Sequence, residues 1–369
     1  MGKRKSFMAE REKIAAGAGG TPAPFARALL HWNATENDRP MPWKGEKDPY
    51  RIWLSEVILQ QTRVEQGRAY YERFIDAFPT VQQLARAPEA DVFKLWEGLG
   101  YYSRARNLMA SARRITDDLG GRFPDTLEGI LSLRGVGPYT AAAIASFAWN
   151  LPHAVVDGNV YRVLARIFNC DLPIDSTEGR KWFARKAQEL LPGGLAGEYN
   201  QALMDFGATL CKPLPECGRC FYRERCGAFL QGRQTELPVK AKKAAIRNRY
   251  FHYVLLQQGG AFALHERGAK DIWQGLWEPL LIESERPLEK AEVLAALAAE
   301  YGLAAGDYTV LSAAAKAKQR LSHQLIHFSF LHLELRRRPP LPGFEWLPAA
   351  ALERVACPKT VGDFLRKNG

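Results

Sequence analysis

Two glycines separated by one residue, inside an otherwise apolar stretch, restrict the fold of this chain more than any other feature. Residues 133–147, LRGVGPYTAAAIASF, predict a helix, a tight glycine hairpin and a second helix. We expect Gly135 and Gly137 to adopt positive φ angles, which cost glycine little, and Pro138 to begin the next helix. Backbone amides at such a helix start bind anions, and with a net charge of +11 the expected anion is a nucleic-acid phosphate.

A carboxylate follows this hairpin about twenty residues further along the chain. Asp157 stands directly before an apolar-periodic run that contains Val160, Val163 and Leu164. This is an N-cap position, where backbone amides and the helix dipole keep a carboxylate ionised. The sequence therefore predicts a phosphate-binding hairpin followed by a charged carboxylate.

A glutamate lies within a second helical segment, residues 51–62, RIWLSEVILQQT. Ile52, Glu56 and Gln60 share one helix face, and most of the neighbouring residues are apolar. Loss of hydration would raise the pKa of Glu56 and keep it protonated, as a general acid requires at neutral pH. The alternative, which periodicity alone favours, is a glutamate at the solvated edge of an amphipathic helix.

Two aromatic residues occupy a glycine turn ahead of a basic helix in residues 95–108, LWEGLGYYSRARNL. Exposed aromatic rings beside arginines stack on nucleic-acid bases or wedge between them. The alternative is that Tyr101 and Tyr102 only pack the turn.

Four of the six cysteines are clustered within sixteen residues with spacings of five, two and five residues. They are Cys211, Cys217, Cys220 and Cys226. This pattern indicates a metal centre in a reducing compartment, either zinc or an iron–sulfur cluster, rather than a disulfide framework. The isolated Cys170 and Cys357 are assigned to ordinary packing.

The composition predicts two folded parts. The chain has 369 residues, 47% of them hydrophobic, and its positive charge favours a nucleic acid as partner, with an anionic membrane surface second. No run of eighteen apolar residues is present, so we expect no membrane span. The expected divisions are a disordered basic tail (1–22), a helical domain (23–231), a basic linker (232–249) and an α+β domain (250–369).

Helical periodicity runs through the first folded part, and alternating segments begin near residue 250. Helices are expected at residues 24–35, 49–62, 67–78, 80–87, 89–99, 103–119, 177–191 and 199–211. In the second part we expect a strand, a glycine turn and a strand over 250–268, a helix at 290–303, a long strand at 323–336 and a short helix at 357–367.

In combination and order, these motifs resemble those of adenine-specific mismatch DNA glycosylases of the MutY kind, which belong to the helix-hairpin-helix superfamily that includes endonuclease III. The resemblance spans residues 25–366 and rests on MPWK, SEVILQQTRV, WEGLGYYSRARNL, LRGVGPYTAAAI, VDGNVYRVL, YNQALMDFGATLC, the cysteines and LSH. It implies an all-α helix-hairpin-helix glycosylase domain with an iron–sulfur cluster loop, followed by a C-terminal α+β Nudix-like domain.

The resemblance also implies catalytic roles. Glu56 matches the general acid that protonates the extruded adenine, and Asp157 matches the carboxylate that faces the oxocarbenium-like sugar. Tyr139 matches the tyrosine that hydrogen-bonds this pair, and Asn159 the asparagine that holds the catalytic water. Bifunctional relatives carry a lysine at the place of Tyr139. A phenol cannot form their Schiff base, so the implied enzyme removes the base and leaves an abasic site.

Recognition residues follow from the same resemblance. Gln60 and Gln61 match a segment that contacts the damaged guanine, with Tyr101 as a wedge beside it. The adenine pocket is matched by Arg39, Trp43 and Gln201, and the 8-oxoguanine recognition loop of the Nudix-like domain by Leu321, Ser322 and His323. The helix that carries metal-binding glutamates in Nudix hydrolases has alanines here, so we expect binding without hydrolysis.

The implied cofactor is a [4Fe-4S] cluster on Cys211, Cys217, Cys220 and Cys226, with zinc as the alternative. The family usually has six residues in the first gap, and here there are five. We expect a cytoplasmic monomer that acts on double-stranded DNA containing adenine opposite 8-oxoguanine or guanine. Two alternatives remain open: an endonuclease III-like pyrimidine glycosylase with lyase activity, and a noncatalytic protein that binds damaged DNA.

Overall fold

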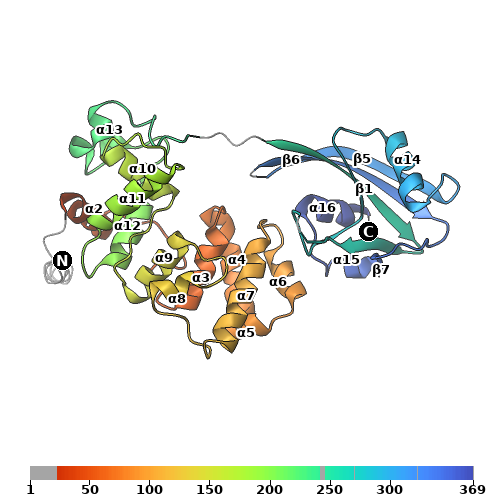
Figure 1. Ribbon diagram of the computed structural model, residues 1–369, viewed down its shortest axis with the longest axis horizontal. Helices are drawn as coiled ribbons and strands as arrows, with labels where there is room; N and C mark the ends of the chain where they lie inside the picture. Colours follow the sequence, from red (N-terminus) through yellow and green to blue (C-terminus); the bar gives the residue numbers. More distant parts are fainter. Residues whose placement is uncertain (1–22, 242–245, 270, 322, 369) are drawn as a thin grey trace. The chain divides into compact units, whose positions relative to one another are not determined.

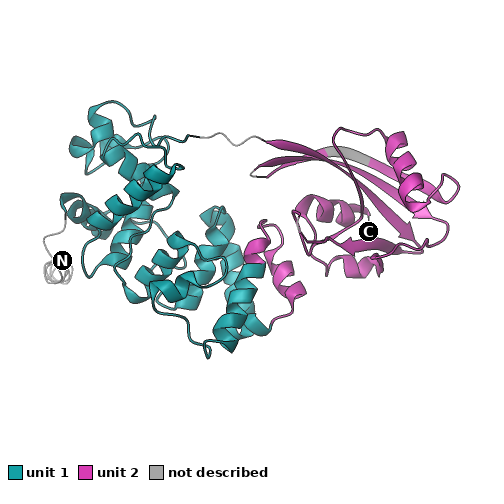
Figure 2. Ribbon diagram, in the orientation of Figure 1, with its two compact units in different colours: residues 1–86, 106–243 teal, residues 87–105, 244–369 magenta. Residues whose placement is uncertain are grey.

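The computed structural model describes residues 23–241, 246–269, 271–321 and 323–368, with the backbone alone for 314–316. These residues form two compact units (Figure 2). Unit 1 runs up to Arg86 and resumes from Arg106 to the end of the first described range, and unit 2 combines Ala87–Ala105 with the C-terminal part. The expected tail, four residues of the expected linker and Ser322 lie outside the described residues, and the expected divisions at 231 and 250 stay a prediction.

Helices occupy the chain up to Leu230, and the described residues before Arg247 hold no strand (Figure 1). They are α2 (Pro24–Thr35), α3 (Pro49–Leu59), α4 (Val64–Ala77), α5 (Val81–Arg86), α6 (Glu89–Trp96), α7 (Ser103–Asp117), α8 (Leu127–Leu131), α9 (Pro138–Trp149), α10 (Gly158–Ile167), α11 (Thr177–Leu190), α12 (Ala196–Thr209), the 3-10 turns η1 (Cys217–Arg219) and η2 (Arg223–Arg225), and α13 (Gly227–Leu230).

Small residues bring the central helices of unit 1 close together. A Cβ atom on Gly197 would lie 2.5 Å from the backbone oxygen of Ser146, so α12 packs directly on α9. A Cβ atom on Gly207 would lie 2.7 Å from Cβ of Asn159, which brings α12 equally close to α10. Apolar side chains of α2, α9, α10, α11 and α12 fill one common core, and this close packing positions the site described below.

Unit 2 is built on one mixed sheet with the strand order β3-β2-β1-β6-β5, in which β4 also pairs with β1 and β7 with β2. Its elements are β1 (Arg247–Gln258), β2 (Ala261–Glu266), β3 (Trp277–Glu278), β4 (Leu280–Ser284), α14 (Lys290–Tyr301), β5 (Tyr308–Arg320), β6 (Gln324–Leu335), β7 (Glu345–Pro348), α15 (Ala349–Leu352) and α16 (Lys359–Asn368). The central strands β1 and β6 are parallel, and the other pairs are antiparallel.

A helix packs on each side of this sheet. Val293 and Leu297 of α14 join one apolar core, whereas Val361 and Phe364 of α16 join another. Because successive side chains of a strand point to opposite faces, β1 contributes to both cores. The N-terminal segment of this unit is tied to α16 by an ion pair of 3.7 Å between Glu97 and Arg366.

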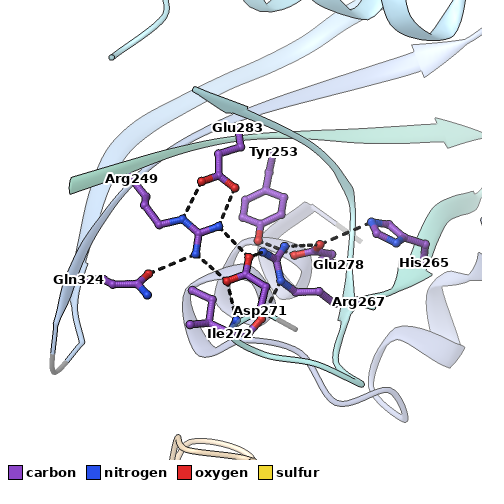
Figure 3. A network of polar contacts seen from close by, with 9 residues as sticks. All are labelled: Arg249, Tyr253, His265, Arg267, Asp271, Ile272, Glu278, Glu283 and Gln324. Atoms are coloured by element: carbon purple, nitrogen blue, oxygen red, sulfur yellow. Dashed lines mark hydrogen bonds and ion pairs between the residues drawn. The ribbon is translucent and has the colours of Figure 1, made fainter. Parts of the chain in front are cut away.

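A network of arginines and carboxylates braces β1, β4 and the loop that precedes β3 (Figure 3). Arg249 pairs with Asp271 at 2.7 Å and with Glu283 at 2.6 Å. The same arginine donates to the side chain of Gln324, the first residue of β6. The network therefore anchors the base of the turn between β5 and β6.

No helix in the described part of the chain has the length and hydrophobicity needed to span a bilayer.

Candidate active site

Glu56 projects from α3 into the interior of unit 1, where it is only 7% exposed. Burial raises the pKa of Glu56 to about 7, the nearby charge of Asp157 adds to the rise, and a hydrogen bond with Tyr139 opposes it. This position excludes the alternative of a glutamate at a solvated helix edge. The side chain is thus half-protonated near neutral pH.

Asp157 is the N-cap of α10, as predicted. Its carboxylate accepts hydrogen bonds from the backbone amide of Val160 at 2.7 Å and from Nδ2 of Asn159 at 2.8 Å. Burial raises the pKa of Asp157 above its ordinary value, and these hydrogen bonds oppose the rise. The N-cap position stabilises the charged form of Asp157, as predicted, but here it limits a rise in pKa that burial causes and that the sequence did not indicate.

Tyr139, in the first turn of α9, interacts with both carboxyl groups. Burial, followed by the charges of Glu56 and Asp157, holds the pKa of Tyr139 well above its usual range. Its hydroxyl is also 3.6 Å from Sδ of Met204. The side chain is therefore a neutral phenol, and α3, α9 and α10 bring together three groups from distant parts of the sequence.

A cavity of about 390 Å³ opens beside Glu56. Trp43 and Gln201, both predicted for a base pocket, line it together with Lys44. The predicted Arg39 is ion-paired with the buried Asp205 at 2.8 Å. A volume of this size lies within the range typical of small-molecule sites.

Asn159 connects Asp157 with the cysteine loop. Its Oδ1 accepts a hydrogen bond of 2.8 Å from Arg162, and the same guanidinium donates to the backbone oxygen of Cys211 at 2.8 Å. Arg162 was missed by the sequence analysis. Its position one helical turn after Asn159 was the available signal, but nothing local indicated that the cysteine loop lies opposite.

The four clustered cysteines line one cavity of about 30 Å³, together with apolar residues such as Phe206 and Leu210. Arg166 donates to Sγ of Cys211 at 3.4 Å and to the backbone oxygen of Pro213 at 2.9 Å. Among the described residues, no group of three or more His, Cys, Asp or Glu side chains is arranged around a single metal ion. Four thiols around one apolar cavity, with a guanidinium beside one sulfur, fit a thiolate-bound cluster.

The glycine hairpin only partly matches its prediction. Gly135 has a φ of 79°, and a Cβ atom there would lie 2.7 Å from Cβ of Asn107, so both backbone and space favour glycine. The prediction for Gly137 was wrong, because its φ is −94°, an angle open to any residue. Gly137 is instead the N-cap of α9, whose first residue is Pro138 as expected.

Two predicted DNA-contacting residues have unusual backbones. Gln61 has a φ of 58° and Tyr101 a φ of 49°, left-handed conformations that are uncommon outside glycine. Tyr101 is 42% exposed, whereas Tyr102 is buried. The neighbouring Gln60 leaves α3 as its C-cap and donates to Oγ1 of Thr140 at 3.3 Å. Strained positions of this kind are concentrated at functional sites.

In unit 2, the predicted recognition loop falls at the turn between β5 and β6. The backbone oxygen of His323 accepts a hydrogen bond of 2.9 Å from the amide of Arg247, and the amide of Leu321 donates to the oxygen of Gln324 at 2.8 Å. His323 is exposed. A hydrogen bond from the first residue of β1 thus holds this turn, and the side chain of His323 is exposed to solvent.

The helical fold with a buried carboxyl group beside a pocket, joined to an α+β unit, agrees with the two family models that match this chain, and they define a base-excision DNA repair glycosylase. Residues 54–191 match a family model described as "HhH-GPD superfamily base excision DNA repair protein", and residues 252–367 match one described as "NUDIX domain". A solved structure of a thermostable thymine-DNA glycosylase is similar, with 31% identity, a TM-score of 0.52, and coverage of 56% of this chain and 95% of that one.

Curated relatives narrow this class. Adenine DNA glycosylase of Buchnera aphidicola subsp. Baizongia pistaciae is 34% identical over 255 residues, which cover 69% of this chain and 72% of the relative. The rat adenine DNA glycosylase is 42% identical over 229 residues, 58% of this chain and 44% of that protein. The chain belongs to the adenine DNA glycosylase family, and it is a DNA glycosylase of base excision repair.

Proposed function

We propose that this enzyme hydrolyses the N-glycosidic bond of adenine mispaired with 8-oxoguanine or guanine in duplex DNA and leaves an abasic site. The observation that carries the proposal is the interacting set of buried Glu56 with the partly buried Tyr139 and Asp157, of which Glu56 lines a base-sized cavity. Adenine has to leave the duplex to reach this cavity. Extrusion costs a few kcal/mol, and less at a mispair.

Glu56 supplies the proton in this mechanism. With its pKa raised to about 7, the carboxylic acid protonates the imidazole ring of adenine as the bond to C1′ breaks and the bonding electrons move to the base. Asp157, which retains its amide donors, faces the cationic sugar and stabilises it. Water then adds to C1′ and transfers a proton to one of the two carboxylates, Glu56 or Asp157. Asn159 orients the carboxylate of Asp157 by donating a hydrogen bond to it.

The polar groups near Glu56 support a glycosylase without lyase activity. Tyr139 is a phenol and offers no amine for a Schiff base. Two lysines line the cavity, but Lys44 pairs with Asp205 at 3.0 Å and Lys47 donates to the backbone oxygen of Phe147 at 2.8 Å. A nucleophilic amine must be free and unprotonated, so neither lysine is set up for that reaction.

The four cysteines hold a [4Fe-4S] cluster in this proposal, and such a cluster supplies a rigid cross-link and a redox-active centre. Arg162 and Arg166 already fix the backbone of the loop, so the cluster would complete that support. The loop is basic and would bind phosphate through Lys212, Arg219, Arg223 and Arg225. Equimolar iron and sulfide, rather than one zinc ion, would be the result of metal analysis on purified protein.

Unit 2 recognises 8-oxoguanine without hydrolysing a substrate. Leu321, Ser322 and His323 would contact the damaged guanine, as would Gln60 and Gln61 of unit 1. Tyr101 would be a wedge beside that base, and Gly135 and Gly137 would bind the adjoining DNA. Helix α14 contains two acidic residues. Glu292 forms a capping box with the N-cap residue Glu289 and pairs with Arg286 at 2.5 Å, and Glu300 lies near the helix end. The enzyme would act as a monomer on DNA.

Single-turnover excision on duplexes with adenine opposite 8-oxoguanine, followed by alkaline cleavage of the abasic strand, tests this function. Glu56→Gln should abolish excision and retain DNA binding. Glu178→Gln is the matched control, because Glu178 is an exposed carboxylate in the first turn of α11 and should leave excision unchanged. Excision that persists near the wild-type rate in Glu56→Gln would eliminate Glu56 as the acid.

Three further measurements separate the rival activities. Release of thymine opposite guanine, with adenine untouched, would favour the activity named for the similar thymine-DNA glycosylase structure. A covalent adduct trapped by borohydride in high yield would restore the lyase alternative. Binding to the mispaired duplex without any base release would favour the noncatalytic alternative.

A further inference from the structure

Asp205 of α12 is fully buried, and no step of the proposed reaction uses it. Both of its oxygens are saturated. Oδ1 accepts from Arg39 at 2.8 Å and Gln201 at 3.0 Å, and Oδ2 from Asn37 at 2.9 Å and Lys44 at 3.0 Å. A carboxylate has about four lone-pair positions, so these four donors use all of them.

The carboxylate determines which end of the Gln201 amide faces it. An ionised carboxylate only accepts hydrogen bonds, so the amide presents Nε2 to Asp205. The reversed orientation would place Oε1 against Oδ1, two acceptors with no proton between them. Because the neighbouring donors hold both oxygens, Asp205 cannot turn to accommodate such a reversal.

This orientation leaves Oε1 of Gln201 as an available acceptor. None of the described residues donates to this oxygen, and Gln201 lines the same cavity as Glu56. The wall of the base cavity therefore presents a hydrogen-bond acceptor whose direction is fixed by a buried anion.

We infer that Asp205 is a positioning residue that makes Gln201 select a 6-aminopurine and reject a 6-oxopurine. The inference rests on the proposed function, since it requires an extruded purine in the cavity. The 6-amino group of adenine donates to Oε1, whereas the 6-carbonyl of hypoxanthine or guanine faces it acceptor to acceptor. Two buried acceptors without donors slow excision of the 6-oxopurine by about ten- to a hundredfold.

The test compares adenine, purine and hypoxanthine, each placed opposite 8-oxoguanine, in single-turnover excision by the full chain. Wild-type enzyme should prefer adenine, with unsubstituted purine intermediate. In Asp205→Asn, the new amide can donate to Gln201, which then turns its own NH2 into the cavity. The ratio of adenine to hypoxanthine excision should fall about tenfold or more.

A second variant distinguishes orientation from structural damage. Asp205→Asn combined with Gln201→Glu exchanges the donor and the acceptor of this hydrogen bond. The carboxylate introduced by Gln201→Glu accepts hydrogen bonds in either orientation, so it presents an acceptor to the cavity whichever way it turns. The double variant also retains an anion near Arg39 and Lys44. This double variant should recover the preference for adenine. As a control, Asp117→Asn breaks an exposed aspartate–arginine pair, Asp117–Arg86, and should leave the ratio unchanged.

An unchanged ratio in Asp205→Asn would overturn the inference, as would a folded double variant that does not regain selectivity. If Asp205→Asn does not fold, the double variant decides alone, supporting the inference if it is selective for adenine and refuting it if not. Wild-type protein that excises no adenine would refute the proposed function instead, before any variant is compared.

Discussion

The protonation of Glu56 gives the most direct quantitative prediction. Burial raises the pKa of Glu56 from its ordinary 4.5 to about 7. The acid form is the active one, so excision should be lost as pH rises through this value. About a tenth of the molecules carry the proton at pH 8 and about a hundredth at pH 9. The single-turnover rate should therefore fall about tenfold per pH unit above neutrality.

The pH profile also has an acid limb. Asp157 acts in its ionised form, and burial raises its pKa above the ordinary 3.8, so the rate should fall again below a midpoint that lies above 3.8. The assay is single-turnover excision from about pH 4 to pH 9 at saturating enzyme, with Glu56→Gln as the reference for catalysis without the acid. A rate that stays constant between pH 6 and pH 9, or an alkaline midpoint near 4.5, would refute the argument.

The same shift has a consequence for stability. A carboxyl group whose folded-state pKa is raised favours the folded state below its ordinary pKa of 4.5, and that contribution is lost as pH rises through about 7. The rise of roughly 2.5 units corresponds to about 3 kcal/mol, at 1.36 kcal/mol per unit. Glu56→Gln, which stays neutral, should therefore raise the melting temperature at pH 8 and change it much less at pH 5. Equal changes at both pH values would contradict the assignment.

Other side chains give further expectations. Arg162→Met removes the hydrogen bonds that Arg162 donates to the side chain of Asn159 and to the backbone oxygens of Gly207 and Cys211. The melting temperature and the excision rate should both fall, with a loss of about 1–3 kcal/mol in the free energy of unfolding. Unchanged values of both would contradict the bridging role. Tyr101→Asn removes the aromatic ring but keeps a residue that tolerates the left-handed backbone of this position. Fluorescence anisotropy should show binding to the mispaired duplex weakened by about 1–3 kcal/mol, whereas the melting temperature should stay unchanged. DNA affinity should fall linearly on a log–log plot against salt, with a slope of about −0.9 per phosphate contacted, and a flat plot would exclude phosphate-dominated binding.

Features with local signals were predictable from the sequence. Helix α2 has the predicted bounds of 24–35, and Asp157 is the predicted N-cap. By contrast, the helix predicted over 49–62 ends at Leu59, because Gln60 leaves it and Gln61 takes a left-handed conformation. The pattern failed at Gln61, a residue that the proposed function places at the DNA, and such a conflict between local preference and fold is expected at functional positions.

Features that depend on distant partners were not predictable. Strand β5 (Tyr308–Arg320) contains an alanine- and lysine-rich segment without clear alternation, and its conformation comes from pairing with β6. Cys357, by contrast, was assigned to ordinary packing from the sequence alone, and its side chain is buried. Asp205 carried no signal, because its partners Asn37, Arg39 and Lys44 are more than 160 residues away.

Three carboxyl groups of unit 1, buried Glu56 and Asp205 and partly buried Asp157, differ chiefly in how many donors surround them. Within the part of the chain that the structure describes, Tyr139 is the one hydrogen-bonding neighbour of Glu56, so burial dominates and the carboxyl group retains a proton that it can donate. Asp157 accepts from backbone and side-chain donors that oppose its desolvation, which suits a charge held against a cationic sugar. Asp205 has four donors and no unused lone pair, so it can contribute to the reaction only through the groups that it holds. The number of donors around each carboxyl, which helix packing sets, thus separates an acid, a stabiliser and an anchor built from the same functional group.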